Sequence, residues 1–274
     1  MIPVLAATDL DGTVLFSDRA MGSARPDPAR LTPIDVVDDH VYAYMTDTVV
    51  DGWTRLAADG VVLPATTRSV PQYTRLRLPG RAPKYAVVCN GARILVDGSP
   101  DPDWERRVRA ALVEAAPFAE VERQCVGWRE AHDVASLRSV EDFFLYFTVT
   151  VREDWFALFA GEVADWCRPR GWRASLQGRK LYLLPEVLDK AAAVAEVAER
   201  LGAQRVVAGG DSLLDQRMLS TADAAIRPAH GELHLTGYSA PNCRTTSGHG
   251  AAAGDEIMDW YADELGTHRV ARIA

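Results

Sequence analysis

Two acidic motifs in the sequence could bind a metal ion. Asp9 and Asp11 are two residues apart in the segment Asp-Leu-Asp-Gly-Thr, and Asp211 and Asp215 are four residues apart further along the chain. Two carboxylates about 4 Å apart repel each other by about 4 kcal/mol at an effective dielectric of about 20, so a cation is expected beside them. Oxygen ligands suit a hard divalent cation such as Mg²⁺. Each motif alone also has a structural interpretation, as an acidic turn or as a helix N-cap.

Hydroxyl and ammonium groups that could hold a phosphoryl group stand between the two acidic motifs. Thr66 and Thr67 follow a short apolar run, and Lys190 begins a helical pattern. Backbone N–H groups and a hydroxyl at a strand-to-helix turn can bind phosphoryl oxygens, and an ammonium group can neutralise their charge. Lys190 is one of three lysines beside 27 arginines, and lysine suits a site that needs a compact point charge. Considered singly, Thr66 is more often a helix cap and Lys190 a surface residue; the four segments together indicate one site.

Short apolar runs and helical stripes must position these side chains. The runs cover residues 3–8, 60–65, 85–89 and 205–209, and each is typical of a buried parallel strand. Helical stripes at residues 48–59 and 189–201 alternate with them. This order predicts an α/β fold with a Rossmann-like, doubly wound parallel sheet, which binds ligands outside the carboxyl ends of its strands.

The stretch between residues 93 and 180 has a different texture. It contains five of the seven tryptophans, helical patterns at residues 103–115 and 151–167, and strand-like segments at residues 143–151 and 180–184. We therefore expect an inserted α+β cap domain at residues 93–180 and a core made of residues 1–92 and 181–274. Residues 21–33 contain three prolines and are expected to be irregular.

Composition and charge narrow the class of protein. With 274 residues, of which 48% are hydrophobic and 25% charged, the chain is typical of a globular protein. A net charge of −8 argues against nucleic acid as a partner. No apolar stretch approaches the roughly 18 residues that a membrane span needs, and the N-terminus has no secretory pattern. Four cysteines without CxxC spacing suit a reducing compartment, so a cytoplasmic location is expected. The oligomeric state stays open.

The four segments together resemble the motifs of the haloacid dehalogenase (HAD) superfamily. Its first motif, DxDGT, matches residues 9–13, and its fourth, GDxxxD, matches residues 210–215. Its second, a threonine or serine after a strand, matches Thr66, and its third, a lysine, matches Lys190. The insert and the segments at residues 65–69 and 89–92 resemble the branch with a C2-type cap, and the length of the insert favours the C2B form. That branch includes Cof-like and sucrose-phosphate phosphatase-like members. Thr67 and Leu214 depart from the glycine and asparagine usual there.

The resemblance implies a HAD-type phosphatase, a phosphoric monoester hydrolase. Asp9 would be the nucleophile that forms an aspartyl-phosphate, and Asp11 would be the general acid and base. The implied substrate is a small phosphorylated metabolite, with a sugar phosphate as the first choice. The resemblance assigns Mg²⁺ to Asp9, the backbone carbonyl of Asp11, Asp211 and Asp215, where Asp215 would bind the ion either directly or through another ligand. It assigns the phosphoryl group to Thr66, Thr67 and Lys190.

Two other functions stay open. A phosphomutase of the phosphomannomutase-like type would share the aspartyl-phosphate but return it to a sugar hydroxyl. A metabolite-binding or pathway-partner protein with weak residual phosphatase activity would keep the fold and lose the turnover. The intact set of motif residues argues against the second of these.

Substrate choice is expected to lie in the cap, because the motif residues handle only the phosphoryl group. Cationic and aromatic side chains there could contact a sugar or a base. The candidates are Trp128, Arg129, His132, Arg179 and Lys180. Tryptophans are also the natural core of a small domain. His230 and His234 have i, i+4 spacing, but a transition-metal site there lacks a third ligand, so both are expected in a loop.

Overall fold

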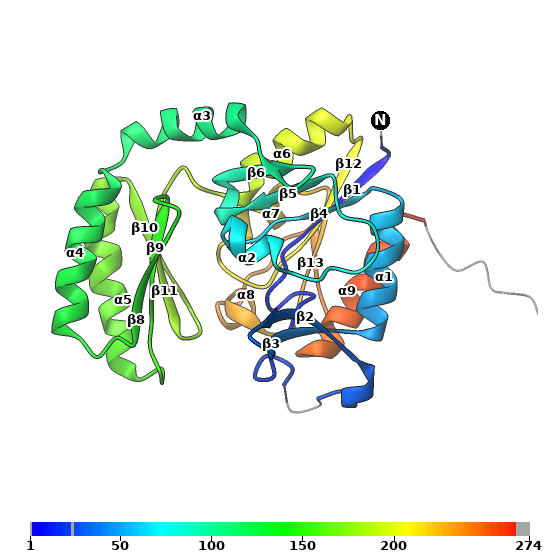
Figure 1. Ribbon diagram of the computed structural model, residues 1–274, viewed down its shortest axis with the longest axis horizontal. Coiled ribbons are helices and arrows are strands. Elements are labelled where there is room, and N and C mark those ends of the chain that lie inside the picture. The colour runs from blue at the N-terminus through cyan, green and yellow to red at the C-terminus, as the bar shows by residue number, and fades with distance from the viewer. Residues whose placement is uncertain (1, 23–24, 267–274) are drawn as a thin grey trace, which may run out of the picture.

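The computed structural model describes residues 2–22 and 25–266, which form a core and a smaller cap (Figure 1). The core contains a five-stranded parallel sheet in the order β14-β13-β12-β1-β4. Its strands are β1 (Val4–Thr8), β4 (Val62–Pro64), β12 (Arg205–Gly209), β13 (Ala224–Arg227) and β14 (Cys243–Thr245). β1 pairs in parallel with β12 on one side and with β4 on the other, which places the topological switch point at its carboxyl end.

Two core helices begin with side-chain caps and end as the sequence predicts. The Thr46 side chain accepts from the Val49 N–H at the start of α1, and Asp189 accepts from the Ala192 N–H at the start of α6. α6 ends at Gly202, which adopts a left-handed conformation. α1 and α9 lie side by side on one side of the sheet (Figure 1). The core helices are α1 (Asp47–Ala58), α2 (Val70–Thr74), α6 (Lys190–Leu201), α7 (Gln216–Thr221), α8 (Gly231–Leu235) and α9 (Ala251–Glu264).

Three of the four predicted strands, β1, β4 and β12, lie in the parallel sheet. The fourth, β5 (Tyr85–Val88), meets it through a parallel bridge between Ala65 and Val87. β5 otherwise pairs antiparallel with β6 (Arg93–Val96), which pairs with β7 (Ser99–Pro100). The sequence analysis did not predict β13 and β14, because the segments Ala224–Arg227 and Cys243–Thr245 do not form distinct apolar runs.

A β-hairpin follows the first strand. The sequence analysis expected residues 21–33, which include the start of this hairpin, to be irregular. The hairpin consists of β2 (Leu31–Val37) and β3 (His40–Thr46). Its register shifts between Pro33 and Asp35 and again between Asp35 and Val36. These irregularities interrupt the two-residue alternation by which a strand is identified, so the prediction for residues 31–33 was wrong.

The cap is a four-stranded antiparallel sheet with helices on one face. The strand order is β10-β11-β9-β8, and Figure 1 shows α4 and α5 on the face turned away from the core. The strands are β8 (Ser136–Val140), β9 (Phe144–Thr148), β10 (Trp172–Gln177) and β11 (Lys180–Pro185). The helices are α3 (Pro102–Ala111), α4 (Phe118–Ala131) and α5 (Asp154–Cys167).

The sheet pairing places the cap boundaries differently from residues 93 and 180. β6 and β7 pair with β5 and so belong with the core, while β11 continues in the cap sheet to Pro185. α3 also binds the core, since the Trp104 indole N–H donates to the Gly91 carbonyl at 2.9 Å. Hydrogen-bonded pairing between strands distant in sequence is not visible in composition, on which the expected boundaries were based.

Two further observations concern the apolarity of the helices and the state of the cysteines. Within residues 2–22 and 25–266, no helix combines the length and the apolarity needed to cross a bilayer. Cys89, Cys125, Cys167 and Cys243 are free thiols, the first three of them buried.

Candidate active site

Four side chains, from two strand ends and one helix start, meet at the carboxyl edge of the parallel sheet. Asp9 follows β1, Asp211 and Asp215 follow β12, and Lys190 is the first residue of α6. One oxygen from each of the three carboxylates lies within 4.8 Å of the others. The Lys190 Nζ lies 2.6 Å from Asp9 Oδ1 and 2.6 Å from Asp215 Oδ1. The structure therefore brings together the residues of the first, third and fourth motifs.

The electrostatics of this cluster favour an added cation. Burial raises the pKa of Asp9 to about 7, although Lys190 opposes the rise. Burial and the neighbouring Asp9 and Asp215 carboxylates raise the pKa of Asp211 well above its usual value. Burial would lower the pKa of Lys190, but its two carboxylate partners raise it, so the ammonium stays charged. Three carboxylates, of which only Asp9 and Asp215 are paired with the ammonium, form an all-oxygen donor set that fits a hard divalent cation such as Mg²⁺.

Close backbone approach holds the cluster in place. Gly12 has φ +84°, and a Cβ built there would lie 2.6 Å from Asp211 Oδ2, so glycine is required. The Ser212 backbone N–H and hydroxyl both donate to Asp215 Oδ2, at 3.0 and 2.8 Å. One oxygen of Asp215 is therefore held by Ser212, while the other meets Lys190.

The two threonines of the second motif have different environments. Thr66 is fully buried, its backbone N–H donates to the Val87 carbonyl at 2.9 Å, and its hydroxyl accepts from the Arg68 N–H at 3.2 Å. Thr67 lines the cavity described below, whereas Thr66 is not among the lining residues. Ser69 caps α2 in place of Thr66, with a capping box to Gln72.

Asp11 is held by Arg68, to which the sequence analysis assigned no role. Arg68 Nε donates to Asp11 Oδ2 at 2.7 Å, and Arg68 Nη2 donates to Asp11 Oδ1 at 2.8 Å. Burial by the surrounding protein atoms would raise the pKa of Asp11, but the Arg68 guanidinium holds this pKa below its usual value. Asp11 is therefore a carboxylate in this form.

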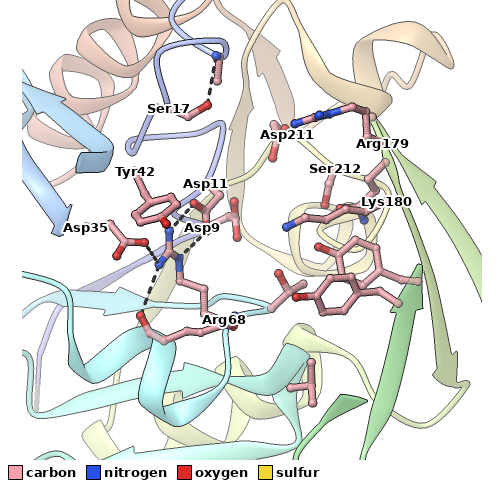
Figure 2. Close-up of a pocket in the computed structure, with 18 of the residues that line it drawn as sticks. Asp9, Asp11, Ser17, Asp35, Tyr42, Arg68, Arg179, Lys180, Asp211 and Ser212 are labelled. Atoms are coloured by element: carbon pink, nitrogen blue, oxygen red, sulfur yellow. Dashed lines mark hydrogen bonds and ion pairs between the residues drawn. The ribbon is translucent and has the colours of Figure 1, made fainter. Parts of the chain in front are cut away.

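A cavity of about 570 Å³ lies between the core and the cap, within the size range of small-molecule sites (Figure 2). Asp9, Asp11, Lys190 and Asp211 line it from the core, and Arg179 and Lys180 line it from the turn between β10 and β11. Further lining residues that the sequence analysis missed are Asp35, Tyr42, Arg68, Gln72, Arg75, Tyr146, Gln177, Tyr182 and Glu232.

The cap turn that carries Arg179 and Lys180 is tied to the core. The Gly178 N–H donates to Glu232 Oε1 on α8 at 2.8 Å. The Lys180 Nζ lies 5.3 Å from the centroid of the Tyr146 ring. Tyr182 and Asp11 raise the pKa of Lys180 above its usual value, so this side chain brings a positive charge to the cap wall of the cavity.

Trp128, Arg129 and His132 lie away from the cavity, which does not support the expected contact with substrate. The Trp128 ring lies 5.8 Å from Phe159 and 5.2 Å from Trp166, measured between centroids. His132 stacks on Trp155 at 5.9 Å, and Arg129 is exposed on α4. These side chains belong to the helical layer of the cap, on the far face of its sheet.

The alternation of side chains along β9 is the sequence signal from which the cavity-facing tyrosines could have been predicted. Leu145 and Phe147 pack in the cap core beneath α4 and α5, whereas Phe144 and Tyr146 pack with the core of the protein. Tyr182 is directly opposite Tyr146 on β11 and shares its face. Once the residue range of β9 is known, this two-residue period shows which of its side chains lie on the cavity-facing side of the cap sheet.

His234 is a helix residue, in contrast to the prediction, whereas His230 lies outside the helix, as expected. His230 is the N-cap residue of α8, and His234 lies within that helix. The His230 Nδ1 accepts from the Gly250 N–H at 3.0 Å, so its Nε2 is the nitrogen that donates to the Gly12 carbonyl at 2.8 Å. A five-residue helix has too few turns to show an apolar period.

Comparisons with known proteins identify the fold. No protein-family model and no curated protein sequence matches this chain. Among solved structures, the sucrose-phosphatase of Synechocystis sp. PCC6803 in complex with sucrose and phosphate has a TM-score of 0.68 at 14% identity, covering 97% of this chain and 99% of its own. A trehalose-6-phosphate phosphatase related protein has a TM-score of 0.57 at 15% identity, covering 96% and 98%. A HAD subclass IIB sugar phosphatase has a TM-score of 0.57 at 10% identity, covering 97% and 100%.

The structural neighbours are therefore HAD superfamily phosphatases, matched over nearly the whole chain. At these identities the likeness establishes the fold. The predicted fold class, a doubly wound α/β core with an added α+β unit, is confirmed.

Proposed function

We propose that this protein is a Mg²⁺-dependent phosphomonoester hydrolase that acts on a small phosphorylated metabolite. The observation that carries the proposal is the convergence of Asp9, Asp211 and Asp215 within 4.8 Å around the Lys190 ammonium, at the end of a cavity of about 570 Å³. A nucleophile, a cation and a divalent-metal donor set at one point are the components that phosphoryl transfer requires.

In this proposal the reaction has two steps. An Asp9 oxygen attacks phosphorus, the bond from phosphorus to the ester oxygen breaks, and the departing alcohol takes a proton from Asp11. In the second step Asp11 removes a proton from water, whose oxygen attacks phosphorus and releases Asp9 and inorganic phosphate. Lys190, held 2.6 Å from Asp9, would bind a phosphoryl oxygen and offset the charge of the transition state.

Bound Mg²⁺ would supply positive charge opposite the phosphoryl oxygens. Asp9, Asp211 and Asp215 are the side chains that would hold it, and the resemblance adds the backbone carbonyl of Asp11. Thr67, at the cavity wall, is better placed than the buried Thr66 to meet a phosphoryl oxygen with its side chain. Thr66 would contribute by holding the loop that carries Arg68.

A sugar phosphate is the substrate class that we favour. The wall beyond the phosphoryl end consists mainly of hydroxyl, amide and charged groups, including Tyr42, Gln72, Tyr146 and Gln177. Such groups match a leaving group with several hydroxyls better than an apolar one. The sugar phosphatases among the structural neighbours are consistent with this choice.

Phosphate release from a panel of hexose, disaccharide and polyol phosphates, measured with Mg²⁺ and with a chelator, tests the proposal. We expect turnover only with Mg²⁺, and Asp9→Asn should reduce it at least about 1,000-fold. Asp39→Asn, an exposed change in the β2–β3 turn, is the matched control. Retained turnover in Asp9→Asn, or equal rates with the chelator, would refute the assignment.

A further inference from the structure

A chain of alternating charges connects Asp11 to the β2–β3 hairpin (Figure 2). Arg68 uses Nε and Nη2 for Asp11, and its Nη1 donates to Asp35 Oδ2 at 2.6 Å and to the Gln72 carbonyl at 3.3 Å. Arg75 donates to the two Asp35 oxygens at 2.8 and 3.1 Å. All three guanidinium nitrogens of Arg68 are therefore engaged, and they join two carboxylates from different parts of the core.

The two carboxylates that share Arg68 differ in their freedom to move. The Asp35 side chain is 2% exposed and is held by two arginines, and it lies at the register irregularity of β2. The Asp11 side chain is 49% exposed, lines the cavity and has its ion pair with Arg68 alone among the described residues. Asp35 is thus the anchored end of the chain and Asp11 is the free end.

The observed arrangement of Asp11 is incompatible with proton donation. Both of its oxygens accept N–H groups from Arg68, so neither oxygen carries a proton toward the cavity. A general acid needs an O–H group within hydrogen-bond reach of the ester oxygen. The ion pair between Arg68 and Asp11 must therefore open, and Asp11 must take up a proton from solvent, before the alcohol departs.

We propose that Asp35 is a positioning residue that retains Arg68 on the core while Asp11 turns toward the ester oxygen. This inference rests on the proposed role of Asp11. Arg68 forms ion pairs with Asp11 and Asp35 within the described part of the chain, so Asp35 and the neutral Gln72 carbonyl remain to hold it when Asp11 leaves. Without the Asp35 charge, Arg68 follows Asp11 and keeps both of its oxygens occupied.

Leaving groups that do and do not need a proton separate this role from a merely structural one. The experiment compares kcat/KM of Asp35→Asn for a hexose 6-phosphate cleaved by the wild type and for 4-nitrophenyl phosphate, whose leaving group departs as an anion. We expect the hexose phosphate value to fall at least about tenfold and the nitrophenyl value to change by less than about threefold. Asp39→Asn, in the same hairpin, should change neither.

A second measurement tests whether the effect passes through Arg68. In an Arg68→Met background, Asp35→Asn should cause no further selective loss, because the group that Asp35 retains is absent. An equal loss with both substrates, or a selective loss that persists without Arg68, would overturn the inference. Where Asp35→Asn does not fold, Asp35→Glu, which keeps the charge but displaces it, is measured with the same two substrates.

The inference and the proposed function fail in different ways. A wild-type protein that releases phosphate from neither substrate refutes the proposed function. A wild-type protein that is active, with Asp35→Asn and Asp39→Asn indistinguishable on both substrates, refutes only the role of Asp35.

Discussion

Replacing Lys190 by methionine should strongly destabilise the metal-free protein. The ammonium is 1% exposed and lies 2.6 Å from an oxygen of Asp9 and from an oxygen of Asp215. Lys190→Met keeps most of the side-chain volume but leaves these buried carboxylates without their cation. Removing one partner of a buried ion pair costs about 3–5 kcal/mol. At about 2–4 °C per kcal/mol for a chain of this size, the melting temperature should fall by about 10 °C.

Calorimetry at pH 7 with a chelator, and then with Mg²⁺, measures this effect. We expect Mg²⁺ to raise the melting temperature more in Lys190→Met than in the wild type, because the ion replaces the missing positive charge. Lys84→Met is the matched control. Lys84 contacts no carboxylate in the described structure; its Nζ lies 5.4 Å from the centroid of the Tyr85 ring and the side chain is exposed, so its loss should cost less than about 0.5 kcal/mol.

The double variant Lys190→Met/Asp9→Asn identifies the cause. It removes one of the unpaired carboxylates, so it should be more stable than Lys190→Met alone. If Lys190→Met melts within the range of the Lys84→Met control, the ammonium does not stabilise the cluster, and the electrostatic reasoning for this site is wrong.

Three further predictions concern the cluster and the cap. The folded-state pKa of Asp9 is raised to about 7 from 3.8, so between these pH values the folded protein holds a proton that the unfolded chain has lost. The free energy of unfolding should therefore fall as the pH rises from about 4 to 7, and it should fall less in Asp9→Asn. Urea denaturation in the presence of a chelator measures this. Gly12→Ala should raise the Mg²⁺ concentration needed for half-maximal activity, whereas Gly60→Ala, with φ +69° and open space around the new methyl, should only lower stability by about 1 kcal/mol. Trp128→Ala should lower stability by about 3 kcal/mol and leave KM within about twofold, and a large rise in KM without loss of stability would contradict its place in the cap core.

The parts of the fold that sequence analysis predicted are those whose signals are local. β1 and β12 are apolar runs that end at polar residues, and α6 follows from the helical stripe at residues 189–201. The motif residues after these elements come together because parallel strands deliver their carboxyl ends to one edge of the sheet. The phosphoryl end of the candidate site could therefore be assembled from these local signals together with the motif resemblance.

The parts that sequence analysis missed depend on pairing between distant segments. The β2–β3 hairpin contains a register irregularity that hides its alternation, and its Asp35 meets Arg68 only through tertiary structure. The cap candidates were chosen by side-chain type, although the face of the sheet decides which residues reach the cavity. For this reason Trp128 packs against the cap core, while Tyr146, which is directly opposite Tyr182, lines the cavity.

The two ends of the cavity are built from different kinds of segment. The residues that would handle the phosphoryl group come from segments with strong local signals, and they occupy one end of the cavity. The wall beyond them comes from the hairpin with Tyr42, from α2 with Gln72, and from the cap strands with Tyr146 and Tyr182. Because these three elements approach from both the core and the cap, exchanging the cap alone would transfer only part of the substrate preference. Kinetics of a chimera that carries a foreign cap would show this as a preference intermediate between the two parents.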